Sequence, residues 1–218
     1  MNIENLRHCN LGAFRTGSLY ARAKRGLDLL GVAVMAPLIL PMLGLLALLV
    51  KLDSPGPALY FQQRRGLGGK PFRIVKLRTM HMRAPPTGLA ARREDAKTKT
   101  DDCRITRVGR FLRVRRLDEL PQIWNVLVGD MSWIGPRPEA VELADWHAEE
   151  ISFYSCRHLV RPGVTGLSQI CQGHVTELAL VRERLELEMH YLRNLSLGLD
   201  LLLAFKTLRV MLNGAGAR

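Results

Sequence analysis

The longest apolar stretch of the chain runs from Leu29 to Val50 and contains no charged residue. A straight helix over it would reach roughly 33 Å at about 1.5 Å per residue, enough to cross the hydrocarbon core of a bilayer. The stretch begins late, is long for the apolar region of a signal peptide, and precedes no Ala-x-Ala-like cleavage site. We therefore predict a membrane anchor here; the alternative is a helix buried in a soluble core.

Two features argue against a plain spanning helix. Pro37 and Pro41 lie near its middle, where each removes a backbone donor and clashes with the preceding turn, so a kink is expected. Both flanks are basic, with Arg22, Lys24 and Arg25 before the stretch and Lys51 after it. Positive flanks stay on the cytoplasmic side, so both ends are drawn to the same side. On these features alone, a kinked spanning helix and a helix that re-enters the same face are both open.

Two short segments after the anchor, 57–65 and 71–79, interleave apolar with basic residues, and Gly66, Gly68 and Gly69 lie between them. This pattern around a glycine-rich turn predicts a β-hairpin. The alternative is a phosphate cradle, but neither a Lys-Ser/Thr pair nor a helix follows the glycines. Residues 83–102 are polar, and we predict a loop for them.

Most of the remaining chain is expected to be helical, which gives an α+β fold class in which helices dominate. Arginines recur at every third position from Arg104 to Arg116 and predict a basic helical face. A helix that opens at Asp118-Glu119 ends at Gly129. Further helices are expected over 141–158 and 176–212, the latter interrupted near 194–198, and tight loops over 130–138 and 161–166.

Two features have two interpretations each. Residues 199–212 are strongly apolar but too short to span a bilayer, so they form a helix that lies on the membrane or packs under the core. Trp133 is either a packing residue or a platform for a sugar ring.

Composition and net charge limit the kinds of partner that the protein is expected to bind. The 218 residues are 47% hydrophobic, which suits one domain with a real core, and the formal net charge is +12. Such a surplus indicates a negatively charged partner: nucleic acid, an anionic membrane face or a phosphorylated substrate. The four cysteines form no Cys-x-x-Cys pair, so free thiols in a reducing compartment are expected.

Asp118 and Glu119 are the leading candidates for chemistry. A helix N-terminus carries partial positive charge and free N–H groups, and the arginines just upstream also favour an ionised carboxylate. An ionised Asp there is able to act as a nucleophile or a Mg²⁺ ligand; the alternative is a simple helix N-cap. Arg113, Arg137 and Arg161 lie in or beside tight loops, and phosphate recognition favours Arg. With the anchor, these residues indicate phosphate chemistry on a membrane-bound substrate.

Seven short motifs lie between about Ala21 and Met211. They are Lys24-Arg-Gly-Leu-Asp28, Asp53-Ser-Pro-Gly-Pro57, Phe72-Arg-Ile-Val-Lys-Leu-Arg-Thr-Met80, Leu117-Asp-Glu-Leu-Pro-Gln122, Asn125-Val-Leu-Val-Gly-Asp-Met-Ser132, Gly135-Pro-Arg-Pro138 and Arg161-Pro-Gly-Val-Thr-Gly166. Their order and spacing resemble those of the bacterial monotopic phosphoglycosyl transferases, the bacterial sugar transferase family. The sequence departs from the family at Ala36, where members often have Ser, and at Arg115-Arg116, where they often have small or hydroxyl residues.

The resemblance implies an enzyme that transfers sugar-1-phosphate from a UDP-sugar to polyprenyl (undecaprenyl) phosphate and releases UMP. This is the first membrane step of exopolysaccharide, capsule, O-antigen or glycoprotein glycan assembly. It implies a ping-pong reaction in which Asp118 forms a covalent phosphosugar intermediate, with Mg²⁺ bound at Asp118 and Glu119. Glu119 would position the metal or handle a proton. The candidates for binding the substrate phosphates are Arg113 and Arg137, which match the family's arginines, together with Arg161, Lys76 and Arg78.

The resemblance also implies a re-entrant anchor, broken at Pro37, that holds a catalytic domain on the cytoplasmic face of a bacterial inner membrane. The expected divisions are a tail over 1–20, the re-entrant helix over 21–52, the transferase domain over 53–212 and a tail over 213–218. Membrane lipids are expected partners, a homodimer is compatible with the family, and nucleic acid is not expected. The alternatives are a membrane-tethered basic binding or regulatory protein and an inactive scaffold of the same family.

Overall fold

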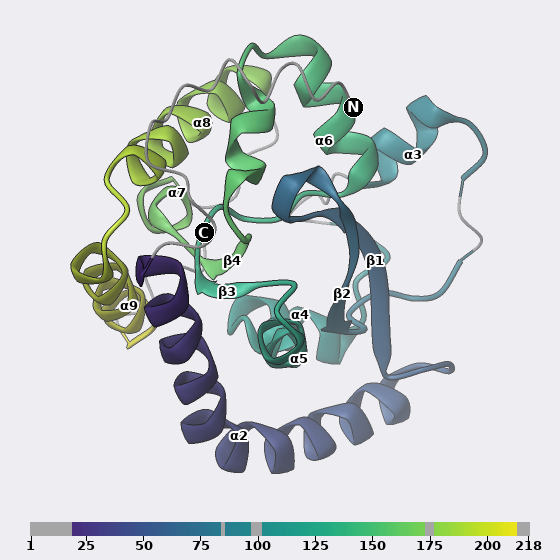
Figure 1. Ribbon diagram of the computed structural model, residues 1–218. Helices are drawn as coiled ribbons and strands as arrows, with labels where there is room; N and C mark the ends of the chain where they lie inside the picture. The colour runs from purple at the N-terminus through teal and green to yellow at the C-terminus, as the bar shows by residue number, and fades with distance from the viewer. Residues whose placement is uncertain (1–18, 84–85, 97–101, 173–176, 213–218) are drawn as a thin grey trace.

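The computed structural model describes residues 19–83, 86–96, 102–172 and 177–212. Within them helices dominate, and the β-structure consists of two sheets of two strands each (Figure 1). The α+β, mainly helical class is therefore confirmed. The prediction of a free thiol at Cys9, one of the four cysteines, lies outside the described residues, as do the predictions for most of the N-terminal tail and for the C-terminal tail.

The predicted anchor is one long helix, α2 (Leu19–Asp53), which contains Pro37 and Pro41. Figure 1 shows α2 bent near its middle into two limbs, with α4 and α5 on the concave side of the bend. The position of the bend fits the two prolines, each of which removes a backbone hydrogen bond of the helix. The predicted kink is therefore present.

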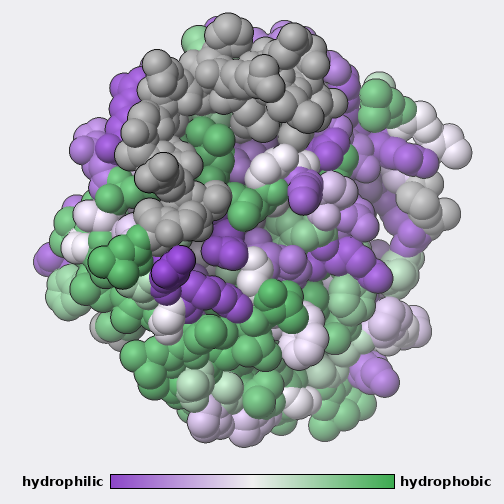
Figure 2. Space-filling view, viewed as in Figure 1, coloured by the Kyte–Doolittle hydropathy of each residue, from purple (hydrophilic) through white to green (hydrophobic). Residues whose placement is uncertain are grey.

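Most apolar side chains of α2 are exposed. A stripe at helical spacing packs against the rest of the protein and consists of Val32, Ile39, Leu46 and Val50. Only 17% of the most apolar window of α2 is buried, whereas a helix in the core of a soluble protein would hide most of its apolar side chains. By length and composition α2 is able to cross a membrane. Figure 2 shows the hydrophobic surface gathered along α2, below a hydrophilic band. An exposed apolar surface of this kind is typical of a membrane or partner contact.

The hairpin forms as predicted. Strands β1 (Leu59–Arg65) and β2 (Pro71–Leu77) pair antiparallel, and a 3₁₀ turn, η1 (Leu67–Gly69), joins them. Gly68 has φ +62°, a conformation that glycine adopts without steric cost. The predicted loop over 83–102 is wrong in part, because it contains the helix α3 (Leu89–Ala96). Its Leu, Ala, Arg and Glu residues are strong helix formers, and their propensity outweighs the polarity of the segment.

The basic helix begins later than predicted, as α4 (Arg107–Val114). The Thr106 side chain caps it by accepting a hydrogen bond from the Gly109 amide at 2.9 Å. Two further short helices follow, η2 (Leu117–Gln122) and α5 (Ile123–Val128), and Gly129 ends α5 with φ +92° as predicted.

The two predicted tight loops also contain strands. Strand β3 (Ser132–Ile134) pairs parallel to β4 (Gly163–Thr165), and a Cβ on Gly163 would clash with the backbone of Gly135. The prediction of loops alone is therefore incomplete, because the pairing depends on a close approach of two segments distant in sequence. Glycine has no Cβ and permits that approach.

The remaining elements are helical. The predicted helix over 141–158 is broken into α6 (Val141–Glu150) and the 3₁₀ helix η3 (Tyr154–Leu159), because Phe153 adopts φ +61° between them. The helical segment after it consists of α7 (Leu167–Cys171), α8 (Leu178–Arg193) and α9 (Leu197–Leu212). The interruption between α8 and α9 lies where it was predicted.

One side of α9 packs under the core, where Leu203 contacts the buried Ile134 and Tyr191. The other side exposes Leu201 and Phe205 beside the exposed face of α2. Packing under the core is therefore confirmed for one side of α9, and contact of the other side with a membrane stays a prediction.

The cysteine prediction holds for two residues. Cys103 and Cys171 are free and exposed. Cys156 is fully buried and disulfide-bonded, so the prediction of a free thiol is wrong for this residue.

Candidate active site

Asp118 and Glu119 occupy the first turn of η2, directly after Arg116, which has φ +56°. A non-glycine residue in the left-handed region is uncommon and turns the chain sharply. The connection from α4 to η2 is therefore short and bent. It brings Arg113, near the end of α4, close enough for its charge to lower the pKa of Asp118.

Asn125 of α5 hydrogen-bonds to the hairpin and so holds α5, and η2 before it, against strand β2. Its Oδ1 accepts a hydrogen bond from the Val75 amide at 3.0 Å, and its Nδ2 donates to the Arg73 carbonyl at 2.8 Å. The buried side chain thus takes the place of a neighbouring strand along one edge of β2. As a result, η2 lies beside β2, and Lys76 of that strand reaches Glu119.

Glu119 is held by two cations. Its Oε1 accepts from Lys76 Nζ at 2.8 Å and from Arg137 Nη2 at 2.6 Å, and its Oε2 accepts from Arg137 Nη1 at 3.3 Å. Burial alone would raise the pKa of Glu119, but the charges of Arg137 and Lys76 and their hydrogen bonds hold it well below its usual value. Glu119 is therefore ionised and fixed in place.

The environment of Asp118 differs from that of Glu119. It is half-buried, and it accepts no hydrogen bond from the described part of the chain. Burial raises the pKa of Asp118, the charge of Glu119 acts in the same direction, and Lys76, Arg113 and Arg137 partly oppose the rise. This carboxylate is thus destabilised and available to react.

Arg113 is positioned by Thr79, whose Oγ1 accepts from the guanidinium Nε at 2.8 Å. This contact leaves the two terminal nitrogens of Arg113 without a hydrogen-bond acceptor among the described residues. Burial lowers the pKa of Arg113, and Asp118 partly offsets the effect. A guanidinium held at one end beside an unpaired carboxylate is suited to bind a phosphate oxygen.

Arg64 of β1 lies in the same group of charges, which the sequence did not indicate. It donates to the Pro138 carbonyl at 2.8 Å, and the charges of Arg137 and Glu119 both affect its pKa. Burial and the neighbouring Arg137 lower the pKa of Arg64 to about 10.

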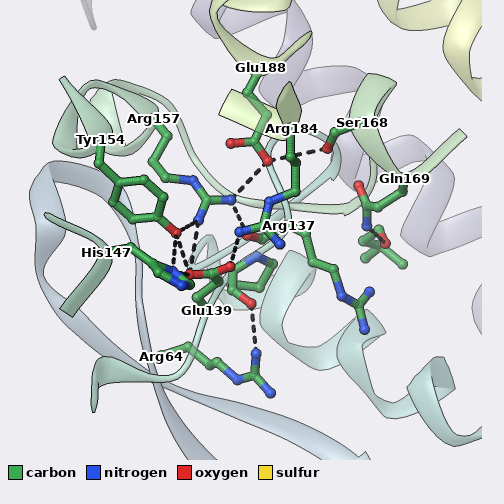
Figure 3. A network of polar contacts seen from close by, with 12 residues as sticks. Arg64, Arg137, Glu139, His147, Tyr154, Arg157, Ser168, Gln169, Arg184 and Glu188 are labelled. Atoms are coloured by element: carbon green, nitrogen blue, oxygen red, sulfur yellow. Dashed lines mark hydrogen bonds and ion pairs between the residues drawn. The ribbon is translucent and has the colours of Figure 1, made fainter. Parts of the chain in front are cut away.

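A buried network of charged residues supports the loop that carries Arg137 (Figure 3). Arg157 Nη2 donates to the Arg137 carbonyl at 2.7 Å and to Glu188 Oε1 at 2.8 Å. Glu139 pairs with Arg184 and, at 2.8 Å, with His147 Nδ1. Each of these side chains, that of Arg137 excepted, is at most 9% exposed. The network fixes the backbone from which Arg137 extends toward Glu119.

Two predicted phosphate-binding residues have other contacts. Arg78 is buried and donates to the carbonyls of Ser54 and Pro55, both at 2.6 Å, and so closes the turn after α2. Arg161 Nε donates to the Gly129 carbonyl at 2.8 Å, at the end of α5. The geometry thus brings Lys76, Arg113 and Arg137 to the carboxylate pair and gives Arg78 and Arg161 contacts elsewhere. Trp133 packs against α2 and donates from Nε1 to the Asp28 carbonyl at 3.0 Å, in keeping with a packing role.

The donors at this site fit Mg²⁺ bound together with a substrate. Within the described residues no group of three or more His, Cys, Asp or Glu side chains could hold a metal. Mg²⁺ commonly binds through one or two carboxylates and completes its shell with substrate phosphates and water. Asp118 offers free oxygens, whereas those of Glu119 already accept from Lys76 and Arg137.

Fold and site define a basic α+β protein in which a bent apolar helix lies under a carboxylate pair surrounded by cations suited to phosphate. The sequence model of the family described as bacterial sugar transferase matches residues 19–214. The chain belongs to the bacterial sugar transferase family.

Named relatives of the chain are similar over most of its length. It is 42% identical, over its full length, to an Aeromonas hydrophila protein named UDP-N-acetylgalactosamine-undecaprenyl-phosphate N-acetylgalactosaminephosphotransferase. It is 45% identical, over 87% of its length, to a Caulobacter vibrioides protein named UDP-glucose:undecaprenyl-phosphate glucose-1-phosphate transferase. An Escherichia coli protein of the same name is 40% identical over 84% of the chain. The matched regions span 50%, 69% and 39% of the lengths of these three relatives.

Proposed function

We propose that this chain transfers a sugar-1-phosphate from a UDP-sugar to polyprenyl phosphate and releases UMP. The contrast between two adjacent carboxylates carries the proposal. Glu119 is paired with Lys76 and Arg137, while Asp118 lies beside the same cations without a hydrogen bond from the described residues. A carboxylate arranged in this way suits attack on a phosphorus atom. The names of the relatives support the choice of donor and acceptor.

The reaction proceeds in two displacements. In the first, a carboxylate oxygen of Asp118 bonds to the β-phosphorus of the donor, the bond from that phosphorus to the bridging oxygen breaks, and UMP leaves with the electron pair. In the second, an oxygen of polyprenyl phosphate bonds to the same phosphorus, and the bond to Asp118 breaks and restores the carboxylate. Lys76, Arg113 and Arg137 offset the negative charge of the phosphates in both steps.

Mg²⁺ is part of the proposal. When bound, it supplies positive charge that offsets the diphosphate and the leaving group. Asp118 would bind the Mg²⁺ ion. Glu119 would also bind the ion if Lys76 or Arg137 moved from Glu119 to the substrate phosphates. The other role of Glu119 is to fix Lys76 and Arg137, both of which it binds directly.

We further propose that α2 enters and leaves the cytoplasmic face of a bacterial inner membrane. Near its start, Lys24 Nζ pairs with Asp200 of α9 at 2.8 Å. At its end, Asp53 Oδ2 accepts from the Val108 amide of α4 at 3.0 Å. Both ends are thus bonded to the same body, while the bend and its exposed apolar side chains project away from it (Figures 1 and 2). This arrangement supports re-entry over a span.

The first prediction tests the nucleophile. Protein incubated with Mg²⁺ and a UDP-sugar radiolabelled in the sugar should retain label after denaturation, and Asp118→Asn should abolish it. Asp145→Asn is the matched control, because Asp145 pairs with Arg65 and its side chain is 44% exposed. Label retained on Asp118→Asn would exclude Asp118 as the nucleophile. The relatives are named for different sugars, so the same assay run over a panel of UDP-sugars assigns the donor.

A further inference from the structure

We infer that Arg64 is a further phosphate-binding residue, whose guanidinium binds an anionic phosphate of a substrate beside Arg137. The inference rests on the proposed function for the identity of that substrate. Arg64 lies on β1, outside the loops and helix ends that the sequence associates with phosphate.

The guanidinium of Arg64 is held in place by neutral partners. Nε and Nη2 donate to Gln62 Oε1 at 3.0 and 2.6 Å, and Nη1 donates to the Pro138 carbonyl at 2.8 Å. A guanidinium has five N–H donors, so these bonds leave one donor on each terminal nitrogen. Among the described residues no carboxylate forms an ion pair with Arg64. Its positive charge is thus oriented but not neutralised.

The surroundings contain more positive than negative charge. Arg64, Lys76, Arg113 and Arg137 influence the pKa values of Asp118 and Glu119 or are influenced by them, so four cations surround two carboxylates. Glu139, the other acid near Arg64, already pairs with Arg157 and Arg184. Burial of an arginine without a carboxylate partner is costly, and a bound anion would relieve that cost. A phosphate group supplies the missing negative charge.

The geometry places Arg64 and Arg137 for a shared ligand. Pro138, whose carbonyl accepts from Arg64, directly follows Arg137 in the chain, and Arg157 holds the Arg137 carbonyl from the other side. Figure 3 shows the guanidinium groups of Arg64 and Arg137 pointing away from the Glu139 network and toward the same side. One short loop therefore sets the positions of both groups.

The alternative is that Arg64 only fastens the Pro138 loop to the hairpin. Arg64→Gln removes the charge but keeps an amide donor, and Arg64→Lys keeps the charge but removes the fork. Arg73→Gln is the matched control, because Arg73 lies on the same hairpin, is exposed, and stacks on the Phe61 ring with 4.8 Å between its Cζ and the ring centroid. It removes the same charge from a place away from Glu119.

The test measures UDP binding to the full chain in lipid nanodiscs, together with the KM for UDP-sugar and the KM for undecaprenyl phosphate. Arg64→Gln should weaken binding of the substrate whose phosphate Arg64 contacts by roughly tenfold or more, because it removes a hydrogen bond between charged groups. Arg64→Lys should recover part of the loss, and Arg73→Gln should resemble the parent. Each variant should unfold in one cooperative thermal transition, which shows that it is folded. Weaker UDP binding with a raised KM for UDP-sugar assigns the donor diphosphate, whereas a raised KM for the lipid alone assigns the lipid phosphate.

Unchanged UDP affinity and unchanged KM for both substrates in folded Arg64→Gln would overturn the inference. If that variant does not fold, the same result in Arg64→Met, which also removes the charge, overturns it. UDP binding requires no turnover, so a parent protein that binds UDP through Arg64 but transfers no sugar would refute the proposed function and leave this inference standing.

Discussion

Asp118 and Glu119 are neighbours in the chain, yet their surroundings shift their pKa values in opposite directions. Burial raises the pKa of Asp118, whereas Arg137 and Lys76 overcome the effect of burial at Glu119 and hold its pKa well below the usual value. Separated pKa values in adjacent groups are typical of residues with different roles in one site. Glu119 is therefore held in its ionised form, and the negative charge of Asp118 is the less stabilised of the two.

The second prediction concerns the pH dependence of the first chemical step. A nearby cation favours the ionised form of Asp118, so its removal raises the pKa of Asp118 further above the usual 3.8. Because only the ionised form attacks, the acid limb of the labelling rate should move to higher pH in Lys76→Gln and in Arg113→Gln. The shift should be larger for Lys76→Gln, since Lys76 lowers the pKa of Asp118 more than Arg113 does.

The measurement is the rate of protein labelling as a function of pH at saturating UDP-sugar. Arg73→Gln serves again as the control, because it removes a positive charge from the same hairpin and should leave the acid limb in place. A shift to lower pH in either variant would contradict the charge environment assigned to Asp118.

At the scale of elements, local signals made part of the fold predictable. The alternation around glycines predicted β1 and β2, and Gly129 marked the end of α5 because the left-handed position after a helix favours glycine. The pairing of β3 with β4 was not predictable, since it depends on contact between segments far apart in sequence.

The same limit applies to the site. Asp118 and Glu119 stood out because charges at a helix start form a local pattern, and Lys76, Arg113 and Arg137 were named with them. Arg64 was missed because its contact, the Pro138 carbonyl, is 74 residues away in the chain. The Glu139 network was missed for the same reason, because it joins α6, η3 and α8 behind the Arg137 loop (Figure 3).

The third prediction addresses the end of α5. The last carbonyls of a helix lack hydrogen-bond donors within the helix. At the end of α5, Arg25 donates to the carbonyls of Val126 and Leu127. Arg161 donates to the carbonyl of Gly129. Arg161→Gln should lower the free energy of unfolding by about 1.5–3 kcal/mol, the contribution typical of a hydrogen bond from a charged group. Its KM for UDP-sugar should stay at the parent value.

Urea denaturation and UMP-release kinetics on the same preparations separate the two roles of Arg161. Arg137→Gln provides the comparison. Because Arg137 contacts Glu119, this substitution should raise the KM for UDP-sugar. A raised KM in Arg161→Gln with unchanged stability would instead favour the phosphate-binding role predicted from the sequence.

At the scale of the whole molecule, the apolar surface and the site belong to one arrangement. The two limbs of α2 enclose α4 and α5, and η2, which carries Asp118, connects those helices (Figure 1). The core cluster that joins α2 to β2 and α5 packs Val32 and Ile39 against Ile74 and Val126. If α2 lies in one leaflet, as we propose, its depth sets the height of Asp118 relative to the membrane surface.

The fourth prediction follows from that arrangement and distinguishes re-entry from a span. Leu19 begins α2 and is 84% exposed, so Leu19→Cys reports the side on which the helix starts. If α2 re-enters, both its ends lie in the cytoplasm, and a membrane-impermeant thiol reagent should miss this cysteine in intact spheroplasts but modify it after lysis. Leu19→Cys is introduced into a Cys9→Ser parent, because Cys9 also precedes α2 in the chain. That parent is the control, since its exposed Cys103 and Cys171 report the side of the catalytic domain. Labelling of Leu19→Cys, but not of the parent, in intact spheroplasts would mean that α2 spans the membrane. The contacts of Lys24 with Asp200 and of Asp53 with Val108 could then not form together, since a bilayer would separate the two ends of the helix.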